Sequence, residues 1–109
     1  MTTSGTIGIF DSGLGGLTVV RSVLDLVPDE PVLYFGDSGR FPYGPKPSDE
    51  VLKYALQIGD VLVDRGARLV VVACNSAAAA ALDTLAARLP VPVVGVLSLI
   101  HISEPTRPA

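Results

Sequence analysis

The most distinctive chemistry in this sequence lies in a single thiol and in an acidic, glycine-rich segment far from it. Cys74 is the only cysteine among 109 residues and directly follows the apolar run Leu69–Ala73. A helix is expected to begin near Ser76, and a helix N-terminus stabilises a thiolate. A thiol open to substrate could then act as an acid/base group, whereas a buried thiol only fills space. Spacing alone leaves both interpretations open.

Residues 11–16, Asp-Ser-Gly-Leu-Gly-Gly, place a carboxylate, a hydroxyl and three glycines between an expected strand and an expected helix. The glycines would let the backbone approach a ligand and present amide donors to a substrate carboxylate. A tight turn capped by Asp11 or Ser12 explains the same residues without a ligand. A dinucleotide fingerprint is excluded because Thr18 replaces its last glycine, and a Walker loop is excluded because no Gly-Lys-Ser/Thr sequence is present.

A second polar loop runs from Asp37 to Pro47 and contains Tyr43 and Gly44, which could offer a hydroxyl and a backbone amide. It is longer than most loops between a strand and a helix, and long loops beside a crevice often bind ligands. The alternative is a surface loop that its three prolines merely stiffen.

Alternating strand and helix signals position these segments. Short β-rich runs are expected at Thr6–Phe10, Val32–Gly36, Leu69–Ala73 and Val93–Val96. Apolar residues at helical spacing lie between them, and Pro28, Gly66 and Pro90 end the three helices. Ser48 is the expected N-cap of the second helix. The expected apolar face of that helix consists of Leu52, Ala55, Leu56, Gly59, Leu62 and Val63.

This alternation predicts an α/β fold, a doubly wound parallel sheet of four strands in the order 2-1-3-4 with helices on both faces. In that order the first and third strands are neighbours, and their connections leave in opposite directions. The crevice that results at the carboxyl ends of the strands is where such folds bind ligands. We therefore expect Asp11 and Cys74 to terminate neighbouring strands and to face one crevice.

Composition excludes several function classes. The net charge is −3, the pI is about 4.8, and Lys and Arg occur singly, so nucleic-acid binding has no electrostatic basis. The longest strongly apolar run is far shorter than a membrane span, and no secretory signal is visible. A single cysteine cannot form an internal disulfide. A cytoplasmic protein without membrane or nucleic-acid partners is expected.

Four motifs in order resemble the glutamate racemase family. Residues 8–19, Gly-Ile-Phe-Asp-Ser-Gly-Leu-Gly-Gly-Leu-Thr-Val, are similar to its opening motif. Residues 34–37 and 42–44 match the next two motifs, and residues 72–77 match the segment that carries the first catalytic cysteine. Ser76 stands where the family usually has threonine, which keeps the hydroxyl. The resemblance covers about Thr6 to Val96.

The resemblance implies one half of a fold in which two similar α/β domains face each other across the substrate. Members interconvert L- and D-glutamate by two-base proton transfer at Cα, without pyridoxal phosphate, metal or other cofactor, and supply D-glutamate for peptidoglycan. Cys74 would be one base, assisted by Asp11. The implied substrate contacts are Asp11, Ser12, Tyr43, Gly44, Asn75 and Ser76. A homodimer of the full-length enzyme is compatible with the resemblance.

The resemblance stops after Val96. The family's second cysteine, in a motif resembling Gly-Cys-Thr-His-Tyr, does not occur in this sequence, and residues 97–109 resemble a translated sequencing-adapter remnant. We therefore expect residues 1–96 to form the N-terminal racemase domain and residues 97–109 to be an extraneous tail in which His101 has no role. The chain is expected to be a truncated, inactive fragment. A natural linker rich in Pro and Ser is the competing interpretation of the tail.

Two other functions remain open. One is a related racemase that acts on aspartate or a hydantoin, against which the Pro42–Gly44 segment favours glutamate. The other is a small module that binds an acidic amino acid without catalysing a reaction.

Overall fold

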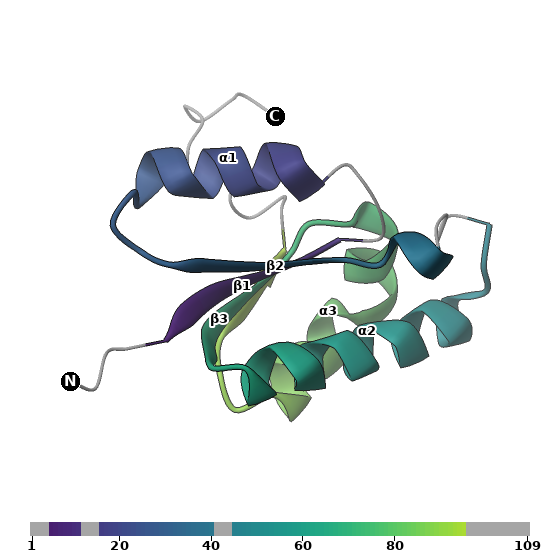
Figure 1. The fold of residues 1–109 in the computed structure, drawn as a ribbon. Coiled ribbons are helices and arrows are strands. Elements are labelled where there is room, and N and C mark those ends of the chain that lie inside the picture. Colours follow the sequence, from purple (N-terminus) through teal and green to yellow (C-terminus); the bar gives the residue numbers. More distant parts are fainter. Residues whose placement is uncertain (1–4, 12–15, 41–44, 96–109) are drawn as a thin grey trace, which may run out of the picture.

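The computed structural model describes residues 5–11, 16–40 and 45–95. Four parallel strands form one sheet in the order β2-β1-β3-β4. They are β1 (Thr6–Asp11), β2 (Val32–Gly36), β3 (Ala67–Val72) and β4 (Val93–Gly95). Helix α1 (Gly16–Leu26) covers one face of the sheet, and α2 (Ser48–Asp64) and α3 (Asn75–Arg88) cover the other (Figure 1). The α/β class and the strand order 2-1-3-4 are confirmed. The expected tail lies outside the described residues.

The two central strands are buried on both faces. Val70, Val71 and Val72 of β3 are each no more than 1% exposed, although successive side chains of a strand point to opposite faces. Ile9 and Phe10 of β1 are equally buried. A parallel sheet requires such apolar strands because its crossover helices pack on both sides.

Two hydrophobic clusters result, one on each face of the sheet. The larger cluster lies between the sheet and helices α2 and α3 and includes Phe10, Val70, Val72 and Leu85. The smaller lies between the sheet and α1 and consists of Ile7, Ile9, Val23 and Val71, with Val19, Val20 and Tyr34 packed against it. In the part of the chain that the structure describes, no helix is long and apolar enough to cross a membrane.

Helix α2 begins and packs slightly differently from the expectation. Pro47, not Ser48, is the N-cap, with an extended backbone (φ −61°, ψ 150°), and its carbonyl accepts the amides of Glu50 and Val51 at 3.1 Å. The proline ring fixes φ, so the chain enters the helix without a side-chain cap. The buried residues of the helix are Val51, Ala55, Ile58, Gly59 and Leu62. The predicted face shares three of these and is otherwise displaced by one position, because the helix packs against both the sheet and α3.

Gly66 ends α2, as the sequence predicts. Its φ of +97° is a conformation that residues with a Cβ rarely adopt. Its amide donates to the carbonyl of Val63 at 3.0 Å, and its own carbonyl accepts the amide of Thr6 at 3.0 Å. The glycine therefore turns the chain from α2 into β3 and joins it to the start of β1.

Candidate active site

The carboxyl ends of β1, β2 and β3 meet at one edge of the sheet. The amide of Asp37, one residue beyond β2, donates to the carbonyl of Asp11 at 2.8 Å. On the other side of β1, the amide of Ala73 donates to the carbonyl of Phe10 at 2.8 Å. These bonds hold the chain on both sides of Asp11. The prediction that Asp11 and Cys74 end neighbouring strands is confirmed.

Asp11 is buried, with 3% of its surface exposed, on the face of the sheet that α1 covers. Tyr34 pairs with Ile9 in the parallel register and therefore lies on the same face as Asp11. The hydroxyl of Tyr34 donates a hydrogen bond to the carboxylate of Asp11. Burial, followed by the negative charge of Asp11 and this hydrogen bond, raises the pKa of Tyr34 above its ordinary value. Tyr34 is therefore a neutral donor at physiological pH.

Cys74 is the N-cap residue of α3, and its carbonyl accepts the amide of Ala78 at 2.9 Å. The side chain is only 7% exposed and belongs to the cluster beneath α2 and α3. Of the two interpretations that the sequence left open, the structure therefore shows the buried thiol. The cause is strand alternation: Val70, Val72 and Cys74 follow one another at a spacing of two, so the thiol continues the buried row.

Asp11 and Cys74 therefore share an edge of the sheet but approach it from opposite faces. Asp11 continues the row of Ile7 and Ile9 on the α1 side, whereas Cys74 lies on the side of α2 and α3. The structure brings the two strand ends together as predicted. It does not direct the two side chains toward the same face.

The other predicted contacts are placed only in part. Asn75 and Ser76 are the first two residues of α3, the former exposed and the latter half-buried. The first-turn amides of a helix have no partner within it, so this end of α3 offers donors to a carboxylate. Ser12, Tyr43 and Gly44 lie outside the described residues.

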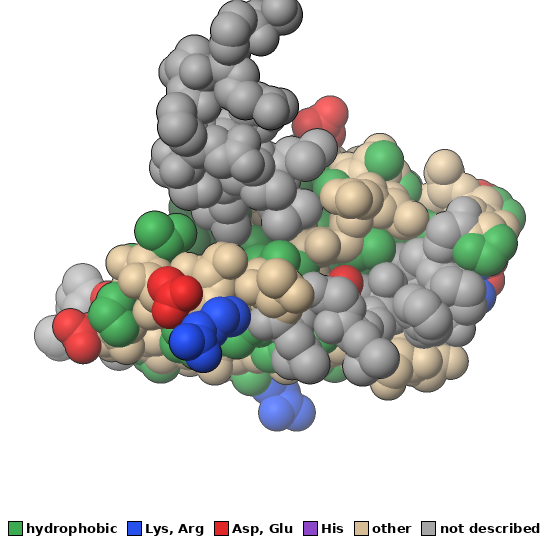
Figure 2. All heavy atoms as spheres, turned by 90° about the horizontal axis from the view of Figure 1, so that it is seen from above, with side chains coloured by type: hydrophobic (Ala, Val, Ile, Leu, Met, Phe, Trp, Pro, Cys, Tyr) green, Lys and Arg blue, Asp and Glu red, His purple; other side chains and the backbone are tan. Residues whose placement is uncertain are grey.

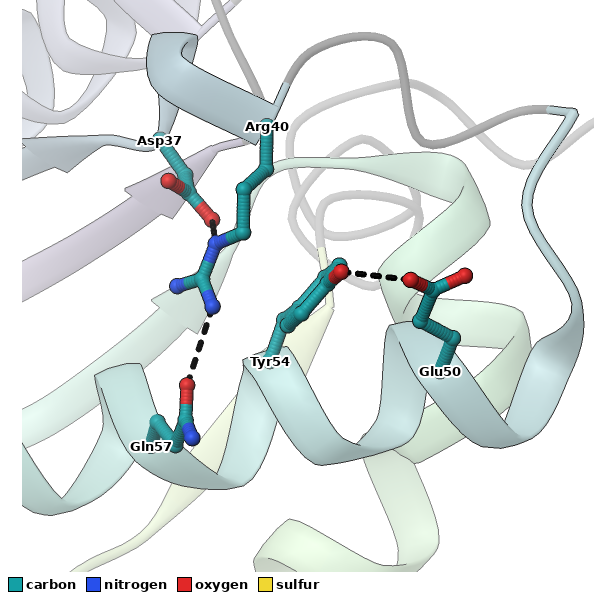
Figure 3. A network of polar contacts seen from close by, with 5 residues as sticks. All are labelled: Asp37, Arg40, Glu50, Tyr54 and Gln57. Carbon is teal, nitrogen blue, oxygen red and sulfur yellow. Dashed lines mark hydrogen bonds and ion pairs between the residues drawn. The ribbon is translucent and has the colours of Figure 1, made fainter.

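A polar network beside this edge was not anticipated from the sequence (Figure 3). Arg40 is the last residue of the short 3-10 helix η1 (Ser38–Arg40), and Asp37 directly precedes this helix. The network joins these two residues to Glu50, Tyr54 and Gln57 of α2. A hydrogen bond to Glu50 is the main cause that raises the pKa of Tyr54. Two sequence spacings could have indicated these contacts: Asp37 and Arg40 are three residues apart, and Glu50 and Tyr54 are four residues apart.

Neither a cavity nor a metal-binding cluster marks a second site in the described residues. A cavity of about 210 Å³ lies between β2 and the C-terminal part of α2, where Val61, Leu62 and Arg65 line it. This part of α2 leads into the start of β3, at the opposite edge of the sheet. Within residues 5–11, 16–40 and 45–95, no cluster of three or more His, Cys, Asp or Glu side chains could hold a metal ion.

Comparison with known proteins identifies close relatives. The glutamate racemase of Corynebacterium kroppenstedtii is 50% identical over 91 residues, which are 84% of this chain and 32% of that protein. The structure of glutamate racemase from Thermus thermophilus in complex with β-chloro-D-alanine is 51% identical, with a TM-score of 0.82 over 84% of this chain and 36% of that one. The Francisella tularensis racemase, in complex with D-glutamate, is 38% identical, with a TM-score of 0.81 over 86% and 36%. No family model matches the chain.

The chain is therefore homologous to glutamate racemases over more than four-fifths of its length. It spans about a third of the length of the relatives it matches. The part that matches in structure is an α/β domain with the same arrangement of strands and helices.

Proposed function

We propose that this chain forms the part of a glutamate racemase that carries one of the two acid/base groups. The observation that supports the proposal is the placement of a carboxylate and a thiol at the ends of adjacent strands, in a domain homologous to glutamate racemases. Cys74 would act on Cα, and Asp11 would assist. The complex of the Francisella tularensis enzyme with D-glutamate supports glutamate as the substrate.

The proposed reaction inverts Cα in two proton transfers. The thiolate of Cys74 takes the proton, so the Cα–H bond breaks, an S–H bond forms, and negative charge passes into the substrate carboxylate. A second acid on the opposite face then donates a proton to Cα. Amides in the first turn of α3 would stabilise the developing charge, because donors fixed in advance act where charge appears in the transition state. In the complete enzyme, a cysteine from outside this sequence would be the second acid.

Asp11 is suited to a supporting role. Its carbonyl is fixed by Asp37 and its carboxylate by Tyr34, so its position is set from two directions. In the proposal, the carboxylate assists by orienting the substrate while Cys74 exchanges the proton at Cα. The product, D-glutamate, would serve peptidoglycan synthesis in the cytoplasm.

The test is incubation of the natural protein that carries this sequence with L-glutamate in deuterated water. We expect deuterium at Cα by proton NMR and accumulation of D-glutamate, both lost in Cys74→Ser. L-aspartate serves as the competing substrate. Faster exchange on aspartate, or no exchange on glutamate, would contradict the proposal.

The burial of Cys74 favours a second candidate, a module that binds an acidic amino acid without turning it over. The same measurements separate the two functions. A binding module would show heat of binding with L-glutamate in calorimetry but no incorporation of deuterium, and Cys74→Ser would bind as well as the wild type.

A further inference from the structure

Two buried acidic residues are neighbours in the backbone at the strand-end edge. Asp11 and Asp37 are 3% and 8% exposed, and a backbone hydrogen bond of 2.8 Å joins them. An acidic amino acid that binds at this edge would bring further negative charge to a site with little water to screen it. Like charges in such surroundings repel strongly, so the site needs a compensating cation.

Arg40 supplies a cation to Asp37. Its Nε donates to Oδ2 of Asp37 at 2.8 Å, and the arginine side chain is one-third exposed while that of Asp37 is 10% exposed (Figure 3). The ion pair is therefore shielded from solvent on the side of Asp37. Hydrogen bonds between charged partners are shorter and stronger than those between neutral groups.

Helix α2 fixes the orientation of this guanidinium. Nη1 of Arg40 donates to Oε1 of Gln57 at 3.0 Å, and the guanidinium carbon lies 3.9 Å from the centre of the Tyr54 ring. The hydroxyl of Tyr54 in turn donates to Glu50 at 2.6 Å, which fixes the ring. Figure 3 shows the contacts from Asp37 through Arg40 to Gln57, and the separate contact between Tyr54 and Glu50 on the same helix. A planar guanidinium can bond and stack at once, which an ammonium cannot do.

We propose that Arg40 is a positioning residue that sets the affinity for an acidic substrate by compensating the charge of Asp37. The substrate part of this inference rests on the proposed function. Arg40 acts through Asp37 and takes no part in the proton transfers at Cα. Its loss should therefore weaken substrate binding far more than it slows the chemical step.

A charge-rescue experiment in the natural protein tests this role. Arg40→Gln removes the ion pair with Asp37 and should raise the KM for L-glutamate about tenfold or more, with kcat changed by less than about threefold. In the double variant Asp37→Asn/Arg40→Gln the negative charge is also gone, so KM should return to within about threefold of the wild type. Arg88→Gln is the matched control, because it breaks an exposed ion pair with Asp60 of the same helix α2. It should change neither constant.

The outcomes separate charge compensation from anchoring. If the double variant has a KM as high as that of Arg40→Gln, the arginine only anchors η1 and the inference is overturned, as it is if Arg40→Gln keeps a wild-type KM. If Arg40→Gln does not fold, Arg40→Lys replaces it and should raise KM by less than about tenfold, because the charge remains although the stacking on Tyr54 is lost. A larger rise in KM would overturn the inference.

Failure of the proposed function would be visible separately. If the wild type neither turns over nor binds L-glutamate, the proposed function fails, and the wild type, Arg40→Gln, Asp37→Asn and the double variant are compared by urea unfolding. Arg40→Gln should then be less stable than the wild type, and Asp37→Asn should restore part of the loss. Additive effects of the two substitutions would show that the pair is not coupled and would overturn the compensation itself.

Discussion

The hydroxyl of Tyr34 is hydrogen-bonded to the carboxylate of Asp11 across the boundary between β2 and β1. The register explains the contact, because Tyr34 lies beside Ile9, two residues before Asp11, and side chains at a spacing of two share a face. A buried carboxylate is thus held by a side chain of the neighbouring strand. Its position depends on correct pairing of the sheet.

Tyr34→Phe should weaken catalysis without unfolding the protein. The substitution removes a hydrogen bond to a charged acceptor, so we expect kcat/KM for L-glutamate to fall about tenfold and unfolding free energy to fall by about 1–2 kcal/mol. Steady-state kinetics and urea unfolding measure the two effects. Ser22→Ala, which removes an exposed hydroxyl bond of α1, is the control and should change neither. Unchanged kinetics in Tyr34→Phe would show that Asp11 does not need this donor.

Alkaline pH should remove a contribution of the tyrosines to stability. The pKa values of Tyr34 and Tyr54 are raised in the folded state, by burial and Asp11 in the first and by the hydrogen bond to Glu50 in the second. The folded chain therefore holds these protons more tightly than the unfolded chain. The contribution is fully present below about pH 10, the ordinary pKa of tyrosine, and is lost as the pH rises through the folded pKa values.

Urea unfolding between about pH 8 and about pH 11.5 tests whether this stabilising contribution falls as the pH rises. The range extends from about 2 units below to about 1.5 units above the ordinary pKa of tyrosine. The difference in unfolding free energy between the wild type and Tyr34→Phe/Tyr54→Phe should be constant up to about pH 9.5 and should shrink above it. A difference that grows with pH would mean that the shifts have the opposite direction.

The strand order could be predicted because it follows from short-range regularities. Apolar runs separated by helical stretches specify parallel strands with crossovers, and right-handed connections leave few arrangements of four strands. The burial of Cys74 could be predicted only in part. The residue continues the alternate row of Val70 and Val72, which favours burial, but it lies between β3 and α3, where spacing alone leaves exposure open.

The network around Arg40 could not be predicted in the same way. Its contact with Gln57 joins residues 17 positions apart, across a loop whose path no periodic pattern specifies. The N-cap at Pro47 was missed for a local reason, because Ser48 is the commoner type of capping residue and lies directly beside it. Regular elements are specified by spacing, whereas such contacts depend on how the elements pack.

Substitutions of Cys74 should separate its chemistry from its packing. In the natural protein that carries this sequence, Cys74→Ser should lower kcat for glutamate racemisation at least about 1,000-fold. A hydroxyl is far too weak an acid to replace a thiol in proton transfer. Since the side chain is buried, both Cys74→Ser and Cys74→Ala should also cost about 1–2 kcal/mol of unfolding free energy. Near-normal turnover in Cys74→Ser, measured by circular dichroism of the product, would assign Cys74 to the core alone.

Gly66→Ala should destabilise the fold, whereas Gly39→Ala should not. The φ of Gly66 is +97°, so a Cβ there is strained, and we expect a loss of about 1–2 kcal/mol. Gly39 has no heavy atom near the place of a Cβ and no positive φ, so its substitution should change stability by less than about 0.5 kcal/mol. Thermal unfolding of both variants gives the comparison. Equal stability of the two would show that the end of α2 does not require a glycine.

The polypeptide of these 109 residues, produced by itself, should not convert L-glutamate into D-glutamate. Racemisation through two bases needs one acid/base group on each face of Cα, and this sequence contains a single thiol. A proton that Cys74 removed could return only to the face it left, so configuration would be retained. The crevice would also lack the closure that excludes water and strengthens the electrostatic stabilisation of the transition state.

Chiral chromatography of L-glutamate incubated with the purified polypeptide tests this, with the Thermus thermophilus racemase as the positive control. Circular dichroism of the polypeptide should first establish that it is folded. Accumulation of D-glutamate that disappears in Cys74→Ser would contradict the prediction, because it would show that this chain provides both proton transfers. D-glutamate that persists in Cys74→Ser would come from a contaminating racemase of the expression host and would call for a repeat in a host that lacks one.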